Sequence, residues 1–216
     1  RAIVLHRSQA WTDAGSRGYQ LLIEEGKLSW SLIHFWPGNA LRIRTIDPLK
    51  VGQWTHVTIT NVGSSRAAGL AIHIDGKRAE TEVVRDSLTK NITGGGGDNI
   101  RIGERMRDRG FTNGSVDRLR VYDRELTELE ILRLSTPDES VAWIANDQLN
   151  EQQRSLLIDH YLRRHDESIQ VQLEKVKQAR MDRCKTQDAL QEIMVMKEEP
   201  DRRESFVLNR GAYDNR

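Results

Sequence analysis

The chain has 216 residues, of which 37% are hydrophobic and 30% charged, with 33 lysines and arginines against 32 aspartates and glutamates. This balance excludes the strongly basic field typical of nucleic-acid binding. The single cysteine, Cys184, excludes an internal disulfide and cysteine-based metal clusters. No apolar run approaches the length of a membrane span. We therefore expect a rather polar globular chain with one or two domains.

The first part of the sequence is rich in predicted strands. Residues 18–34, "GYQLLIEEGKLSWSLIH", predict two strands around a turn at Glu25 and Gly26. Residues 52–60, "GQWTHVTIT", alternate so that Trp54 and His56 share one face of a strand while valine and isoleucine share the other.

Two further strand signals follow. In residues 69–80, "GLAIHIDGKRAE", the Asp75–Gly76 pair is the strongest short signal for a β-hairpin. Residues 114–123, "GSVDRLRVYD", predict the last strand. Short strands separated by glycine-rich turns predict an antiparallel β-sandwich.

After this point the hydrophobic period becomes helical. Thr127 with Glu130, and Thr136 with Glu139, predict capping boxes that start two helices. Asn150 predicts another helix start, and a long polar helix is expected over residues 166–193. We expect three regions, namely a sandwich over 1–134, a helical connector over 135–195, and the start of a following domain over 196–216.

Several of these segments together resemble a known family. The strings "GQWTHVTIT", "GLAIHIDGK" and "GFTNGSVDRLRVYDRELTELEI" occur in the order typical of a laminin G-like domain of the concanavalin A-like jelly-roll superfamily. The resemblance implies a mainly β fold, an antiparallel jelly-roll β-sandwich followed by an α-helical segment. It also implies a strand before residue 1, so we expect an N-terminally incomplete sandwich with an exposed sheet edge.

A finer resemblance places the chain in a larger protein. The strings "HFWPGNALRIRT", "SSRAAGLAIHIDG" and "EIMVMKEEPDRRESFVLNRGAYD" are similar to planctomycete-type cytochrome c-like proteins, in which such a domain lies between two domains of unknown function. This implies a fragment of an exported protein, in the periplasm, cell envelope or extracellular space. Any haem would lie in a module outside this chain, and the flanking domains of the same polypeptide would be partners.

Candidate ligand-binding residues are exposed aromatics and clustered arginines. Tryptophan rings can stack on sugars, and guanidinium groups match sulfate and carboxylate. The candidates for a glycan or protein ligand at the sandwich rim are Trp11, Trp36, Arg105, Arg107 and Arg109. The alternatives are a solvated charged loop for the arginines and cover of the sandwich edge for Trp36.

No cofactor is evident, although calcium is possible. Calcium takes six to eight oxygen ligands, and oxygen donors in loops are offered by Asp98, Asn99, Asp108 and Asn113. The alternative is ordinary turn chemistry of aspartate and asparagine. Structural roles are expected for Trp54, His56, Asp75, Gly76 and Asp117, the last as a buried acceptor for backbone N–H groups.

The sequence does not favour catalysis in this fragment. Retaining glycosidases need two carboxyl groups about 5 Å apart, and Asp117 and Asp123 are too far apart along a strand for that geometry. We expect a non-catalytic interaction module that binds glycan or protein through rim loops. Two alternatives stay open, namely an architectural spacer between flanking domains and part of a redox or glycan-processing enzyme whose active site lies outside this chain.

Overall fold

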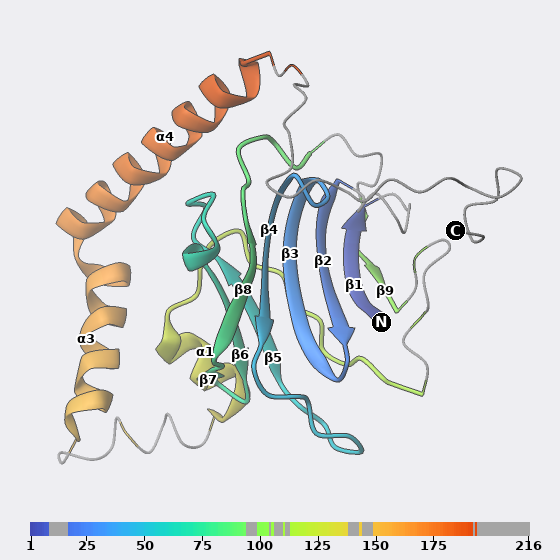
Figure 1. The fold of residues 1–216 in the computed structure, drawn as a ribbon. Coiled ribbons are helices and arrows are strands. Elements are labelled where there is room, and N and C mark those ends of the chain that lie inside the picture. Colours follow the sequence, from blue (N-terminus) through green and yellow to red (C-terminus); the bar gives the residue numbers. More distant parts are fainter. Residues whose placement is uncertain are drawn as a thin grey trace, which may run out of the picture.

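The computed structural model describes residues 1–8, 17–93, 99–103, 105, 110, 113–137, 143, 149–191 and 193. Two antiparallel sheets lie face to face, and helices lie beside them (Figure 1). The expectation of a mainly β antiparallel sandwich followed by a helical segment is confirmed.

The larger sheet has six strands in the order β8-β4-β3-β2-β1-β9, and every neighbouring pair is antiparallel. The predicted turn at Glu25 and Gly26 joins β2 to β3, with φ values of 53° and 79°. The strands are β1 (Ala2–Ser8), β2 (Gly18–Glu24), β3 (Lys27–Phe35), β4 (Asn39–Thr45), β8 (Thr81–Asp86) and β9 (Arg101–Ile102).

The smaller sheet contains β5 (Val57–Asn61), β6 (Leu70–Ile74) and β7 (Lys77–Arg78), with the short 3-10 helix η1 (Ala67–Gly69) just before β6. The predicted hairpin at Asp75 and Gly76 is confirmed, because both residues have positive φ, 49° and 80°. A Cβ on Gly76 would also meet Leu132 and Ser135, so only glycine allows the helix after the sandwich to pack this closely.

An apolar layer between the two sheets forms the core. Trp30 lies in this layer, where its Nε1 donates to the Thr60 carbonyl of the other sheet at 3.3 Å and Tyr19 packs against its ring edge-on at 5.8 Å. The alternate residues of each strand supply the rest of the layer, which includes Leu21, Leu28, Leu32, Leu41, Ile43, Leu70 and Ile72.

The described helices are α1 (Glu128–Ser135), α3 (Glu151–His165) and α4 (Glu167–Ala189). Both the capping box of Thr127 with Glu130 and the helix start at Asn150 are confirmed. Thr136 ends α1 and Pro137 after it is helical, but Glu139 lies outside the described residues, so the second capping box stays a prediction. The long helix predicted over 166–193 is found as α4, which ends earlier than predicted, at Ala189.

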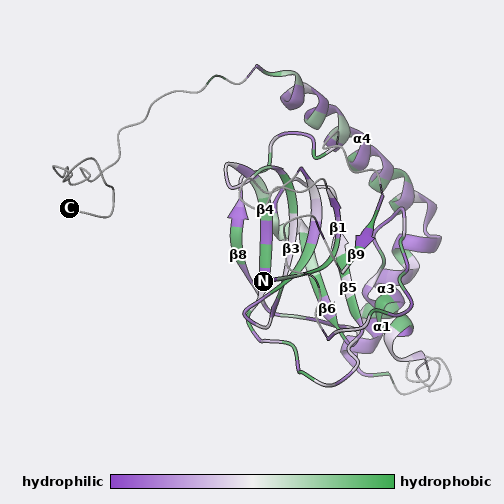
Figure 2. Ribbon diagram, turned by 90° about the vertical axis from the view of Figure 1, so that its right-hand side faces the viewer, coloured by the Kyte–Doolittle hydropathy of each residue, from purple (hydrophilic) through white to green (hydrophobic). Residues whose placement is uncertain are grey.

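Polar contacts attach α3 and α4 to the rest of the molecule, because neither helix contains a buried residue. Figure 2 shows hydrophilic residues along most of α4. A hydrogen bond of 2.9 Å between Thr127 Oγ1 and His160 Nδ1 joins the cap of α1 to α3. Arg180 donates to the Val62 carbonyl at 2.6 Å, and Lys90 donates to the Gln187 carbonyl at the end of α4. In the described part of the chain, none of the helices combines the length and the apolar character that a membrane crossing requires.

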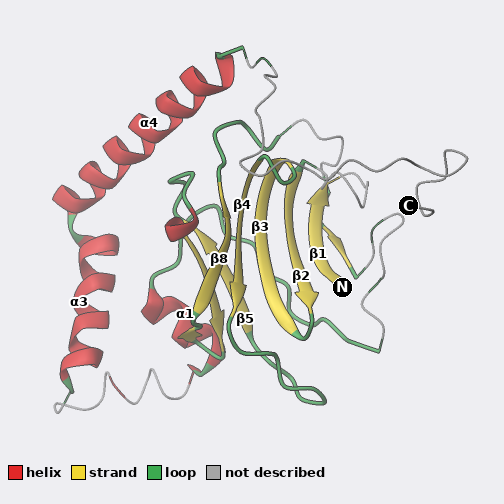
Figure 3. Ribbon diagram, in the orientation of Figure 1, coloured by secondary structure: helices red, strands yellow, loops and turns green. Residues whose placement is uncertain are grey.

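The prediction of a strand over residues 114–123 is wrong. This segment runs as a loop without β-pairing (Figure 3), and Val116 and Val121 are exposed. The physical reason is visible at Arg118, whose φ of 53° turns the backbone out of the extended conformation. Strict alternation therefore cannot continue through this residue.

The outer side of β1, where the sequence predicts an open edge, carries a short strand. Leu5 and His6 pair with Ile102 and Arg101 of β9. The Gly103 N–H also donates to the Val4 carbonyl at 2.9 Å.

Truncation of a core side chain tests the apolar layer. Ile72 is completely buried in it, so Ile72→Ala is expected to lower the free energy of unfolding by about 2–5 kcal/mol through lost contacts and the cavity left behind. Urea titration followed by tryptophan fluorescence measures this change. Val51→Ala is the control, because Val51 is fully exposed and its truncation should leave stability nearly unchanged.

A pH titration tests the burial of His73 on β6. Burial lowers the pKa of this imidazole below its ordinary value of 6.5. As the pH falls below about 6.5, His73 therefore becomes protonated in the unfolded chain before it does so in the native state. The unfolding free energy should decrease over this pH range.

Equilibrium unfolding between about pH 8 and pH 5 measures this decrease. In His73→Leu the decrease should be smaller than in the unchanged protein. His165→Leu changes an exposed imidazole on α3 and should retain the original pH dependence. An equal decrease in all three proteins would show that His73 is not responsible.

Candidate functional site

A row of polar residues crosses the six-stranded sheet on the face opposite the core. The pairing registers place one residue of each of five strands side by side, namely His6, Gln20, Ser31, Arg42 and Arg85. Arg101 of β9 stands opposite His6 and extends the row. Because side chains alternate along a strand, the neighbouring Leu21, Leu32 and Leu41 point to the core, whereas Leu22 and Ile33 share the face of the row and are buried there.

One half of the row is a buried hydrogen-bonded network. Arg105 is only 3% exposed, and its Nη1 donates to Gln20 Oε1 at 2.6 Å and to Ser8 Oγ at 3.3 Å. His6 Nδ1 lies 3.1 Å from the same Ser8 hydroxyl. The guanidinium group of Arg105 thus bonds to side chains of both β1 and β2.

The other half is centred on Arg42. Its Nε donates to Ser31 Oγ at 2.8 Å, its Nη1 lies 3.6 Å from Glu24 Oε1, and its guanidinium lies 3.8 Å from the centre of the Trp36 ring. Burial lowers the pKa of Arg42, and the charge of Glu24 opposes this shift. Arg85 lies on the same ring at 6.0 Å.

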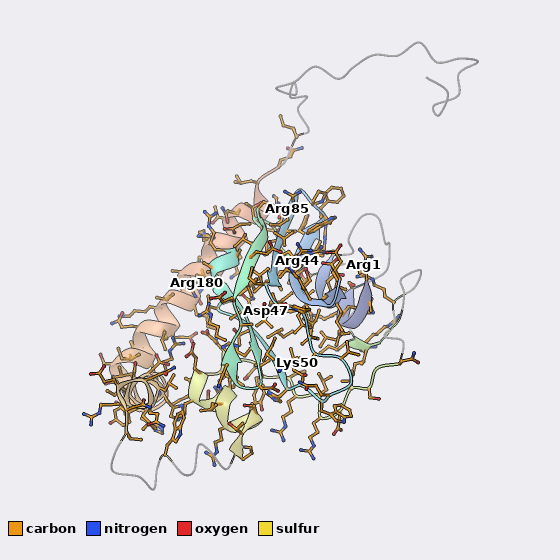
Figure 4. All side chains as sticks on the ribbon, turned by 60° about the horizontal axis from the view of Figure 1, so that its bottom comes forward. Arg1, Arg44, Asp47, Lys50, Arg85 and Arg180 are labelled. Carbon is orange, nitrogen blue, oxygen red and sulfur yellow. The ribbon has the colours of Figure 1, made fainter. Side chains whose placement is uncertain are left out.

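A second row beside the first carries an ion pair and a shallow pocket. Arg44 Nε and Nη2 both lie 2.7 Å from Glu82 Oε1, and this hydrogen bond raises the pKa of Arg44. The pocket has a volume of about 330 Å³ and is lined by Arg1, Glu24, Glu25, Arg42, Arg44 and Val84. Figure 4 shows Arg85, Arg44 and Arg1 on successive parts of the sheet.

We call this surface the polar face and define it by the row from Arg101 to Arg85 together with Glu24, Trp36, Arg44, Glu82 and Arg105. Most of its polar side chains are buried, whereas Trp36 is partly exposed and the shallow pocket reaches Arg42 and Arg44 on rigid strands. These are features of sites that bind a polar ligand.

The structure brings two of the predicted ligand-binding residues to this face. Trp36 belongs to it through Arg42, and Arg105 belongs to it through Gln20. Trp11, Arg107 and Arg109 lie outside the described residues.

The predicted calcium ligands are only partly described. Asn99 and Asn113 are exposed, whereas Asp98 and Asp108 fall among the residues that the structure does not describe. Within the described ranges no group of three or more histidine, cysteine, aspartate or glutamate side chains is placed to hold a metal ion. A calcium site at the rim therefore stays a prediction.

The residues expected to be structural have different surroundings. Asp75 accepts from the backbone N–H of His56 at 2.8 Å and donates its own N–H to the His56 carbonyl, which ties β5 to the turn after β6. Trp54 differs from expectation, because it precedes β5 and is 71% exposed.

Asp117 also differs from expectation. Its side chain is exposed, and it accepts from the N–H of the next residue, Arg118, at 2.8 Å. A buried role for this carboxylate required the strand that the segment does not form.

The sequence analysis missed Arg42, Arg44, Gln20 and Ser31. The available signal was the alternation in "SWSLIH" and "LRIRT", which places serines and arginines on one side of apolar strands. That signal gives the face of each strand but not the register that aligns five strands into one row.

Two antiparallel sheets packed on a single apolar layer define the chain as a β-sandwich domain. The family model of the concanavalin A-like lectin/glucanases superfamily, in its laminin G-like form, matches residues 2–132. The chain therefore belongs to this superfamily.

No curated protein matches the chain. Among solved structures it is similar to an S-layer domain-containing protein (residues 221–444) from Clostridium thermocellum ATCC 27405, with 21% identity and a TM-score of 0.33. The similarity covers 61% of this chain and 63% of that chain, so it spans less than two thirds of the relative. A TM-score this low carries no argument about function.

Substitution of Arg42 tests the network on the polar face. Arg42→Gln should lower the free energy of unfolding by about 1–3 kcal/mol, because Ser31 loses a charged donor and Glu24 loses its partner. Arg85→Gln is the matched control, since Arg85 is exposed in the same row and should contribute little. Equal urea midpoints for Arg42→Gln and the unchanged protein would contradict the assignment.

Proposed function

We propose that this domain is a non-catalytic module that binds a carbohydrate on the polar face of its six-stranded sheet. The observation that supports the proposal is the partly exposed Trp36, whose ring contacts Arg42 at the shallow pocket on this face. Domains of this superfamily are often binding modules. The proposal moves the ligand from the rim loops of the sandwich to the face of a sheet.

Trp36 gives the polar face an apolar platform. The guanidinium of Arg42 lies 3.8 Å from the ring centre, and this cation–π contact holds the ring in position. The side chain is only partly buried, so part of the ring is open to a ligand. A rigid aromatic surface beside hydrogen-bond donors suits a sugar, whose C–H groups pack on the ring while its hydroxyls bond the donors.

The carboxylates of the polar face support binding rather than hydrolysis. Glu82 is engaged by Arg44 at 2.7 Å, and Glu24 lies beside Arg42. Glycoside hydrolysis requires two carboxyl groups that flank the scissile bond, one of which delivers a proton. Carboxylates that already pair with arginines are suited to holding those arginines in position.

The wider setting of the module is part of the proposal. We place it in a larger exported protein of the cell envelope, with flanking domains on the same polypeptide and any haem outside this chain. Calcium at the rim is compatible with this arrangement.

An architectural role is the second candidate, and the attachment of α4 favours it. Lys90 bonds the carbonyl groups at the end of this helix, and Asn91 donates to Asp188 at 2.9 Å. Together with the contacts of α3 to α1, these bonds support a helical pair held against the sandwich. A folded domain that binds no carbohydrate would favour this role.

A glycan-array screen with a tryptophan variant tests the proposed function. Trp36→Ala should weaken carbohydrate binding about fivefold, because an aromatic contact contributes about 1 kcal/mol. Trp54→Ala is the control, since Trp54 is exposed in the connection between β4 and β5. Absence of binding by a protein whose circular dichroism shows a folded sheet would contradict the proposal, as would equal losses in the two variants.

A further inference from the structure

We infer that the contact of α1 with the three-stranded sheet is a pH-sensitive switch. In this inference α1 stays on the sheet while the imidazole of His73 is neutral, and it leaves the sheet when that imidazole becomes protonated. The inference goes beyond the proposed carbohydrate binding and does not depend on it. It follows from the burial of His73, from the surroundings of its ring, and from the position of α1 between the sheet and α3.

His73 lies on the side of β6 that faces away from the core. Leu70 and Ile72 of this strand belong to the core between the sheets, so Ala71 and His73 point to the other side. Both are nevertheless buried, because Ala71 is 8% and His73 is 3% exposed. The outer face of the small sheet is therefore covered at this strand.

The helix that covers it is α1, which lies beside β6 and β7 (Figure 1). Ile131 and Leu132 of this helix are buried, although they do not belong to the core between the sheets. A Cβ on Gly76, in the turn after β6, would meet Leu132. Glu128, in the first turn of the helix, lies close enough for its charge to act on His73. The helix thus packs on β6 from His73 to the turn.

The ring of His73 is poorly supplied with polar partners under this helix. Among the described residues, neither Nδ1 nor Nε2 has a hydrogen-bond partner. The backbone of Thr58 on β5 lies near the ring and favours its protonated form, but the geometry falls short of a hydrogen bond. Burial of a charged group without a partner costs far more than burial of a neutral one. A protonated ring is therefore poorly tolerated beneath α1.

The charged groups around His73 do not offset its burial. Burial lowers the pKa of the imidazole, Glu128 of α1 raises it, and Arg78 of β7 lowers it. Glu128 is itself exposed, so water screens its attraction. The closed arrangement therefore holds the ring in its neutral form, and protonation favours an arrangement in which the ring reaches water.

The sign of the pH effect follows from proton binding. When α1 leaves the sheet, the ring returns to water and its pKa returns to about 6.5. Below this pH the open form binds a proton that the closed form does not bind, so acidification favours the open form. The equilibrium constant for opening should increase about tenfold between pH 7.5 and pH 5.5.

Opening of α1 would also release α3. Thr127, the buried cap of α1, bonds His160 Nδ1 of α3 at 2.9 Å, and Arg164 Nη2 of α3 donates to Glu130 Oε2 at 3.0 Å. In contrast, α4 is held by its own bonds to the loops before β6 and after β8. Acidification should therefore change the position of α3 relative to the sandwich while α4 stays attached.

Hydrogen exchange of the 216-residue chain tests the inference. The reporters are the amides of Ile131 and Thr136, which donate to the carbonyls of Thr127 and Leu132. After correction for the intrinsic pH dependence of exchange, their protection should fall about tenfold between pH 7.5 and pH 5.5. Dilute urea should lower their protection less than that of amides in β3, because local opening exposes less surface than unfolding.

Two variants assign the effect to one imidazole. His73→Leu removes the titrating group and keeps an apolar side chain, so the protection of its α1 amides should not change with pH. His165→Leu is the matched control, because it changes an exposed imidazole of α3 and should retain the decrease. A measurement on the unchanged protein needs no variant, since the NMR signal of the His73 ring should remain that of a neutral imidazole at about pH 6.

The outcomes separate this switch from a general loss of stability. Protection of α1 that does not change with pH, or that falls equally in His73→Leu and the unchanged protein, would overturn the switch. An equal response of the α1 and β3 amides to urea would show that only global unfolding is pH-dependent, and would also overturn it. A protonated His73 ring at about pH 6 with α1 still fully protected would overturn it even if His73→Leu failed to fold.

Discussion

The apolar layer between the two sheets is the interaction on which the rest of the structure depends. Trp30 lies within it and joins the sheets through its bond to the Thr60 carbonyl, while Ile43 and Ile72 are excluded from water on either side. Burial of such side chains is the main favourable term in folding. Because strand side chains alternate, placing these residues inward also fixes which residues of β2, β3 and β4 point away from the core.

The residues that point away from the core are unusual, because many of them are both polar and buried. Ser31, Arg42 and Arg105 are largely hidden from solvent, although an apolar face of the same shape would be less costly to bury. Their hydrogen bonds to one another and to Gln20 compensate part of that cost. Stability alone does not account for guanidinium groups here.

The sequence predicts those elements that are encoded locally. The Asp75–Gly76 hairpin, the cap at Thr127 and the helix start at Asn150 depend on residues at most three or four positions apart. The strand expected around Arg118 is wrong, because pairing partners and not alternation alone decide whether an extended segment joins a sheet. The polar row depends on registers between strands separated by many residues. The sequence therefore identifies Trp36 and Arg105 as separate candidates but does not predict that they lie on the same face.

The described helices contact the sandwich away from the polar face. Within the described ranges, the hydrogen bonds of α3 lead to α1 and to the residues just before it, and those of α4 lead to Val62, Ser64, Ser65, Lys90 and Asn91. These contacts lie at the end of β5 and after β8, and none involves Arg42, Arg44 or Trp36. The helical pair is therefore held by the side of the sandwich and not by the polar face. The proposed architectural role and the proposed binding role therefore involve different parts of the domain and do not exclude each other.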